Sequence, residues 1–212
     1  MHVEFKPDES GVSRPYQWGH AASDPTHRYY DFKKSPELVR TSLEDFKPQE
    51  RWPAVQRFYG LLEWLNGPDS HLESNDCAFW EARSPKPPKP GFTHQCDGRL
   101  MVLFRDLDLN RNEAVIRWLL GKSTELLRAA PGGPWGKIAL SISCCHFEDP
   151  PRSEAWQVTY FFWAWGNGEE QAMARLDEVF AVLESVLREI AKRIGEGEVA
   201  KLLAETKHPG QA

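Results

Sequence analysis

The sequence has no long apolar run and no excess of positive charge. Its longest apolar stretches, such as Leu100–Phe104 and Tyr160–Trp165, are far too short to cross a bilayer. Residues 1–11 are polar and lack an apolar core, so we expect no signal peptide. The net charge of −5 argues against nucleic acid as the main partner, because phosphate binding needs a basic face. We therefore expect a cytoplasmic protein that binds neither membranes nor nucleic acid directly.

Cysteine is also scarce. The four cysteines are Cys77, Cys96, Cys144 and Cys145, and without an expected export signal we interpret them as reduced thiols. His94 with Cys96, and Cys144-Cys145-His146, offer metal-ligand types. Neither group has the C-x-x-C or H-x-x-x-H spacing of a zinc site. We therefore expect no metal site and no other cofactor.

Motifs of phosphate binding and catalysis are incomplete. Gly121–Thr124 (GKST) imitates the end of a phosphate loop, but Ile116 stands where the first glycine belongs. Asp106–Asn110 imitates a calcium loop, but arginines occupy its glycine and glutamate positions. There is no G-x-S-x-G nucleophile motif. We expect a protein that is not an enzyme. The alternative is a small metal-dependent hydrolase or nuclease that uses carboxylates near Asp69–Asp76.

What the sequence does contain is typical of one globular domain. The hydrophobic fraction is 41% and the charged fraction 27%. Nine tryptophans slightly favour a binding surface, because Trp is enriched at interface hot spots. Proline and glycine punctuate residues 1–34, which we expect to form an irregular arm packed on the body. The domain prediction is a single unit over residues 1–212.

Hydrophobic periodicity predicts an α+β fold. Helical spacing predicts helices at 35–46, 53–65, 113–129 and 169–194, and alternation or apolar runs predict strands at 74–83, 99–106, 135–147 and 154–165. Short turns between neighbouring strands favour hairpins. We therefore expect a sheet of about four mainly antiparallel strands packed against helices. The regular stripe on the long C-terminal helix, including Phe180 and Leu187, should be buried.

Two segments could bind a partner. The loop expected within Leu62–Phe79 carries several acids, and the aromatic strand Trp156–Trp165 is followed by two glutamates. Both have a plain alternative, namely capping and turning in the first and core packing in the second. An excess of six negative charges in residues 148–198 is compatible with a basic protein partner. The residues expected to contact a partner are Asp69, Glu73, Asp76, Trp80, Glu81, Glu148, Asp149, Trp165, Glu169 and Glu170.

The stretch Gly60–Trp80 (GLLEWLNGPDSHLESNDCAFW) resembles immunity proteins found beside polymorphic toxins in bacteria, most of all the immunity protein 52 group. The strand TYFFWAW and the helix after it are similar as well. The resemblance implies an α+β protein that binds and neutralises a cognate toxin. Such toxins are commonly restriction-endonuclease-like nucleases delivered by an interbacterial system such as type VI secretion. It implies no catalytic residues and transfers no contact residue. Besides the hydrolase, an adaptor of an unrelated complex stays open.

Overall fold

The computed structural model describes residues 1–6, 9–15, 32–147 and 153–207. In these residues five strands lie side by side in the order β1-β5-β6-β4-β3, and a sixth, β2, also pairs with β5. The strands are β1 (His2–Phe5), β2 (Glu9–Pro15), β3 (Leu72–Arg83), β4 (His94–Phe104), β5 (Gly136–Phe147) and β6 (Ser153–Gly166). The fold is therefore α+β, with a mixed sheet.

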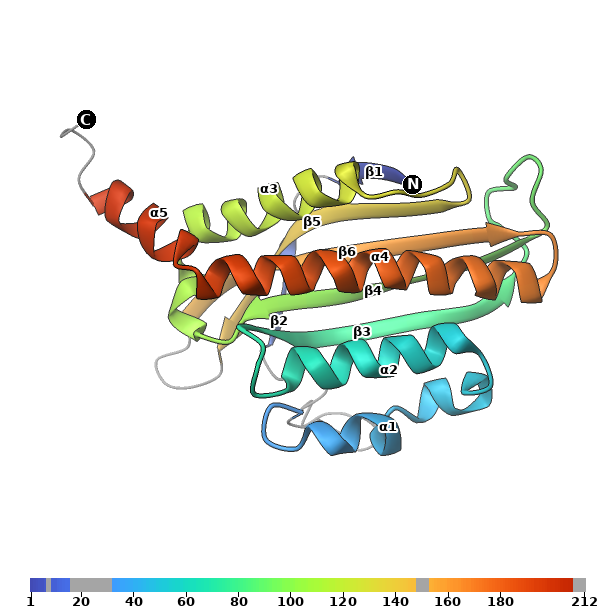
Figure 1. Cartoon of the computed structure of the whole chain (residues 1–212), viewed down its shortest axis with the longest axis horizontal. Helices are drawn as coiled ribbons and strands as arrows, with labels where there is room; N and C mark the ends of the chain where they lie inside the picture. The colour runs from blue at the N-terminus through green and yellow to red at the C-terminus, as the bar shows by residue number, and fades with distance from the viewer. Residues whose placement is uncertain (7–8, 16–31, 148–152, 208–212) are drawn as a thin grey trace.

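The long helices cover one face of this sheet (Figure 1). The α-helices are α1 (Val39–Ser42), α2 (Pro53–Asn66), α3 (Glu113–Ala129), α4 (Glu169–Gly195) and α5 (Glu198–Lys207). Three 3-10 segments precede helices: Pro36–Leu38 before α1, Glu44–Gln49 before α2 and Leu107–Arg111 before α3. α4 runs along the middle of the sheet between α2 and α3, so one helical layer closes one side of the core.

Local sequence signals explain the three long helices. Pro53 occupies the first turn of α2, where its missing N–H costs nothing. The side chain of Asn112 accepts hydrogen bonds from the N–H groups of Ala114 and Val115 and so caps α3. Glycine at 168, with a φ of 100°, turns the chain from β6 into α4. The predicted positions of α2, α3 and α4 are confirmed to within a residue at each end.

The core between the layers is aromatic. Phe180 of α4 stacks on Phe58 of α2 with 4.7 Å between ring centroids, and meets Phe162 of β6 edge to face at 4.9 Å. The predicted burial of Phe180 and Leu187 is confirmed, since neither is exposed to solvent. This packing of α4 is therefore what joins the helical layer to the sheet.

The sheet corrects two expectations. β1 and β2 both run parallel to β5, so the sheet is mixed and larger than the four mainly antiparallel strands expected. Residues 2–5 and 9–15 are strands, so the N-terminal segment is not irregular throughout, while residues 16–31 lie outside the described residues. Parallel pairing joins segments far apart in the chain, and such pairing leaves no local signal.

Three further segments differ from the prediction. β3 begins at Leu72, two residues before the expected strand at 74–83, so Glu73 belongs to the strand and not to the loop before it. α5 follows α4 after Gly197, whose φ is 86°, and no helix was expected there. Residues 36–49, expected as one short helix to 46, form α1 flanked by 3-10 segments. Pro48 lies inside the second of these segments and removes one backbone donor.

Candidate functional site

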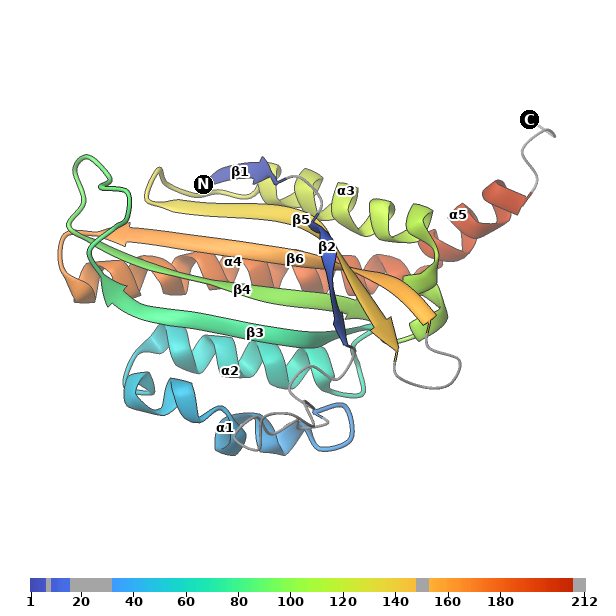
Figure 2. The same ribbon diagram turned by 180° about the vertical axis from the view of Figure 1, so that it is seen from behind.

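No helix of the described residues covers the second face of the sheet, which we call the open face. Figure 2 shows this face with α2, α3 and α4 behind the strands and β2 crossing one part of it. Because side chains alternate along a strand, the residues that do not point to the helices point to the open face. On β6 the even-numbered side chains Val158, Tyr160, Phe162 and Ala164 lie in the main core on the helix side. The odd-numbered side chains of β6 therefore lie on the open face.

Strand pairing aligns two rows of side chains across the open face. In one row Trp80 pairs with Asp97, Asp97 with Trp163, and Trp163 with Lys137. In the next row Ala78 pairs with Arg99, and Arg99 with Phe161. We call Trp80, Arg83, Asp97, Arg99, Lys137, Phe161 and Trp163 the aromatic–arginine strip. It offers ring faces and charged groups from four adjacent strands.

Ion pairs fix the charged members of the strip. Arg83 lies 2.6 Å from the carboxylate of Asp97, and Arg99 lies 2.9 Å from that of Asp76. Lys137 pairs with Glu4 of β1 and holds the pKa of that carboxyl below its usual value. Carboxylates therefore hold both arginines and the one lysine of the strip in place.

The rings of the strip are also held. Phe161 and Trp163 stack with 6.3 Å between their centroids, and the ammonium of Lys6 lies 3.7 Å from the centroid of Phe161. Trp80 is different, because 47% of its surface is exposed. A large exposed indole next to ordered cations is the most conspicuous surface feature of the described residues.

Trp165 lies beside the strip on the open face, in the same cross-strand row as Gln95 and Arg83. Its indole N–H donates to Gln95 at 2.8 Å, and the Gln95 amide donates to Asp97 at 2.9 Å. Asp97 in turn holds Arg83, so a chain of hydrogen bonds runs from a buried indole to an exposed guanidinium. Trp165 is only 6% exposed, and Lys89 lies over its ring at 4.3 Å. The buried indole of Trp165 therefore orients Gln95 and Asp97 and has little free surface with which to contact a partner.

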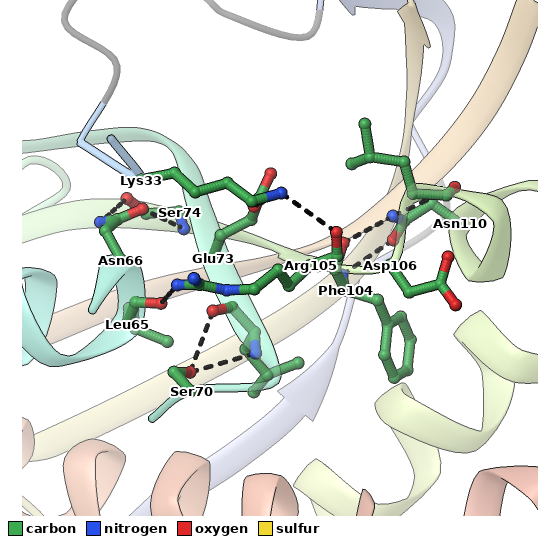
Figure 3. Close-up of polar contacts among 12 residues, drawn as sticks. Lys33, Leu65, Asn66, Ser70, Glu73, Ser74, Phe104, Arg105, Asp106 and Asn110 are labelled. Carbon is green, nitrogen blue, oxygen red and sulfur yellow. Dashed lines mark hydrogen bonds and ion pairs between the residues drawn. The ribbon is translucent and has the colours of Figure 1, made fainter. Parts of the chain in front are cut away.

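Glu73 lies at the other end of β3 in a buried polar cluster (Figure 3). Its carboxylate is 3.2 Å from the ammonium of Lys33, which also donates to the carbonyl oxygen of Arg105. Arg105 donates to the carbonyl oxygens of Leu65 and Gly67 at the end of α2. Glu73 is 2% exposed, so its position favours a structural role.

The turn from α2 to β3 is fixed by its own side chains. Asn66 donates to the carbonyl oxygen of Leu62 and to the hydroxyl of Ser74, and accepts from the Ser74 N–H. Ser70 donates to the carbonyl oxygen of Leu72 and accepts from its N–H. Most of the apolar residues in Gly60–Trp80 are buried in the core. The segment that carries the family resemblance therefore has mainly a structural role here.

The carboxylates near Asp69–Asp76 do not share one space. Asp69 is exposed in the turn and lines a shallow cleft of about 300 Å³ with Trp64, His71, Arg188 and Lys192. Glu73 faces Lys33, and Asp76 faces Arg99 on the open face. Carboxylates matched to cations in this way are typical of structural pairs, which weakens the support for the hydrolase alternative.

The remaining expected contact residues fall into separate groups. Glu81 is exposed near the end of β3, and Glu169 and Glu170 are exposed in the first turn of α4. Glu169 lies 3.5 Å from Arg51. The ends of β3 and β6 and the start of α4 lie at the same end of the molecule, so Trp80, Trp165 and these glutamates share that end (Figure 1). Glu148 and Asp149 lie outside the described residues.

Most of the strip was not expected from the sequence. Arg83, Asp97, Arg99, Lys137, Phe161 and Trp163 were not among the expected contact residues, and of the strip only Trp80 was. Their common feature is that they occupy alternate positions of the strands, on the side away from the buried apolar residues. Alternation along β4 and β6 could have grouped them, because two neighbouring strands carry Arg and aromatic residues in matching phase.

The motifs that imitate phosphate and calcium loops have structural roles. Gly121–Thr124 lies inside α3, where the hydroxyl of Ser123 donates to the carbonyl oxygen of Leu119. Asp106 caps a 3-10 turn, and the amide of Asn110 bonds both backbone groups of Phe104.

The four cysteines are free, and burial raises the pKa of the Cys96 and Cys145 thiols to about 12.

The described residues contain neither a cluster of metal ligands nor a membrane-spanning helix. No three His, Cys, Asp or Glu side chains among them come together as a set of metal ligands. None of the helices in this part of the chain combines the length and the apolar character needed to span a bilayer.

Comparison of the chain with protein-family models, curated proteins and solved structures found no match.

Proposed function

We propose that this protein binds and neutralises a bacterial toxin domain, and that it contacts the toxin through the aromatic–arginine strip. The toxin part of the proposal rests on the resemblance of Gly60–Trp80 to immunity proteins. The contact surface rests on one observation, namely the exposed indole of Trp80 beside arginines that ion pairs hold in place. On this proposal the protein is not an enzyme and acts in the cytoplasm, where it meets the toxin.

The chemistry of the strip suits a protein interface. Trp and Arg are the residues most enriched at binding hot spots, where a few side chains carry most of the binding free energy. Ordering a long side chain on binding costs about 0.5–1.5 kcal/mol. The pairs Arg83–Asp97 and Arg99–Asp76 reduce this cost because both guanidinium groups are already oriented. A strand framework keeps their spacing fixed.

The proposed partner is a restriction-endonuclease-like nuclease, as the resemblance implies, and not nucleic acid itself. Two carboxylates, Asp76 and Asp97, lie among the cations of the strip. They would repel the regularly spaced phosphates of a nucleic acid backbone. The charges on a protein surface are spaced irregularly, so a protein partner can avoid the two carboxylates. The net charge of −5 supports the same choice.

The test is genetic. Each gene beside the one for this chain is expressed in bacteria alone and together with this chain, and growth is measured. We expect one neighbour to be lethal alone and harmless with the wild-type protein. If no neighbour is lethal, or if none is rescued, the toxin proposal is wrong.

A matched pair of variants tests the surface. Trp80 and Phe5 are both large, apolar and half exposed, at 47% and 50%. Phe5 pairs with Leu140, whose side chain is in the main core, so it points to the helical side. We expect Trp80→Ala to weaken rescue and Phe5→Ala to leave it unchanged. Equal rescue by the two variants would place the contact surface elsewhere.

A further inference from the structure

The cations of the strip are more exposed than most of the acids that hold them. The side chain of Arg83 is 46% exposed and that of its partner Asp97 only 15%. The side chain of Arg99 is 23% exposed and that of Asp76 only 7%. The third pair is different, because Glu4 at 36% is more exposed than Lys137 at 23%. Within the two arginine pairs the guanidinium group is therefore more exposed than the carboxylate that holds it, although Glu81, next to Trp80 in β3, is exposed as well.

Three exposed acids of the acidic segment 148–198 lie on the side of the molecule away from the strip. Glu169, Glu170 and Glu178 are exposed on the first half of α4, and α4 belongs to the layer opposite the open face. Acids at the N-terminal end of a helix also complement its dipole, which gives them a structural reason to be there. These three glutamates therefore lie away from the strip, on a helical layer that also carries exposed cations such as Arg117, Arg188 and Lys192.

We propose that the aromatic–arginine strip docks an acidic surface of a protein partner, with carboxylates meeting Arg83 and Arg99 and apolar groups meeting Trp80. The docked surface of a nuclease toxin is then not its basic DNA-binding groove, and inhibition acts from beside that groove. This inference specifies the surface that the proposed function uses, and it rests on the proposed function only for the identity of the partner.

Charge spacing favours a protein over a nucleic acid as the occupant. A nucleic acid strand carries regularly spaced phosphates, so some of them would lie against Asp97 and Asp76 in any register. Carboxylates on a folded protein can instead be placed singly, and arginine recognises a carboxylate through two parallel hydrogen bonds. An acidic protein surface is therefore the occupant that fits the strip.

The experiment uses the full chain labelled with ¹⁵N and three defined probes. These are the peptides Ac-Glu-Glu-Phe-Glu-Glu-NH₂ and Ac-Lys-Lys-Phe-Lys-Lys-NH₂, and a single-stranded thymidine decamer. Binding is followed at low and high salt from the backbone amides and the indole N–H signals of the nine tryptophans. We expect the acidic peptide to shift the signals of Trp80, Trp163 and Arg99, and salt to weaken its binding, since exposed charges are screened.

Two charge reversals complete the test. Arg83→Glu should raise the Kd for the acidic peptide by about fivefold, the size typical of one exposed charge contact. Lys192→Glu is the control, because Lys192 is 65% exposed and lies on α4. Tighter binding of the basic peptide or of the thymidine decamer at the strip would overturn the inference, and so would shifts confined to α4. If the protein rescues cells from a toxin but does not bind the acidic peptide, the acidic docking surface is wrong and the toxin proposal stands. If it binds the peptide at the strip but rescues no cells, the toxin proposal is wrong and the docking surface stands.

Discussion

Phe180 lies where the helical layer meets the sheet. Its fully buried ring contacts Phe58 from α2 and Phe162 from β6. We expect Phe180→Ala to lower the free energy of unfolding by about 3–5 kcal/mol, because it removes apolar contacts and leaves a cavity that the aromatic neighbours cannot fill. Urea denaturation measures the change, with the exposed Phe5→Ala as control. A loss below about 1 kcal/mol would mean that the core is packed differently.

The buried hydroxyl of Tyr160 should make the stability of the protein fall at alkaline pH. Its hydroxyl is buried 2.6 Å from that of Ser123, and burial raises its pKa well above the usual value. Above pH ~10 the unfolded chain loses this proton while the folded chain keeps it, so stability falls as the pH rises further. We expect Tyr160→Phe to reduce this fall between pH 8 and pH 11 in urea titrations. The same fall in both proteins would exclude Tyr160 as its source.

At the scale of elements, Asn66 is the residue that fixes the turn between α2 and β3. Its side chain bonds Leu62 and makes two contacts with Ser74, at 2.9 and 3.3 Å. We expect Asn66→Ala to cost about 1–3 kcal/mol, since it leaves buried or half-buried polar groups without a partner. Asp69→Ala, in the exposed part of the same turn, should stay within about 0.5 kcal/mol of the wild type. Equal losses from the two variants would contradict this role of Asn66.

The helices were predictable from the sequence because their signals are local. Pro53, Asn112 and the apolar spacing of α4 each lie within the element they define. β1 and β2 were not predictable in the same way, because each is short and its partner, β5, lies more than a hundred residues later. Their stability comes from this distant pairing, which periodicity does not report.

The candidate site was predictable only in part. The sequence singled out Trp80 and Trp165, which lie in the strip and beside it, because tryptophan is enriched at interface hot spots. It also singled out Glu73 and Asp76 as acids that contact a partner, whereas both are largely buried and face cations of the protein itself. An acid looks the same in the sequence whether it meets solvent or an arginine. The face on which each strand residue lies becomes known only when the helices are placed.

At the scale of the whole molecule, the two faces should respond differently to charge reversal. Arg83→Glu should slow association with the toxin domain, because long-range attraction acts mainly on the on-rate. Glu169→Lys with Glu170→Lys should change the on-rate less, since these residues lie on the helical layer. Stability should change by no more than about 0.5 kcal/mol in the α4 variant, and by about 1 kcal/mol in Arg83→Glu, which loses its ion pair with Asp97. Stopped-flow kinetics at low and high salt compare them. A larger effect of the α4 reversals would make α4 the surface that faces the toxin.

The central claim is that the aromatic–arginine strip binds a toxin domain tightly. Calorimetry with the purified, catalytically inactive toxin domain from the neighbouring gene tests it most directly. Protection inside one cell needs near-complete occupancy, so we predict a Kd of about 1 nM or lower, which corresponds to about −12 kcal/mol. Trp80→Ala should raise this Kd at least about tenfold, as expected for a hot-spot indole. A micromolar Kd for the wild type, or an unchanged Kd for Trp80→Ala beside Phe5→Ala, would contradict the account.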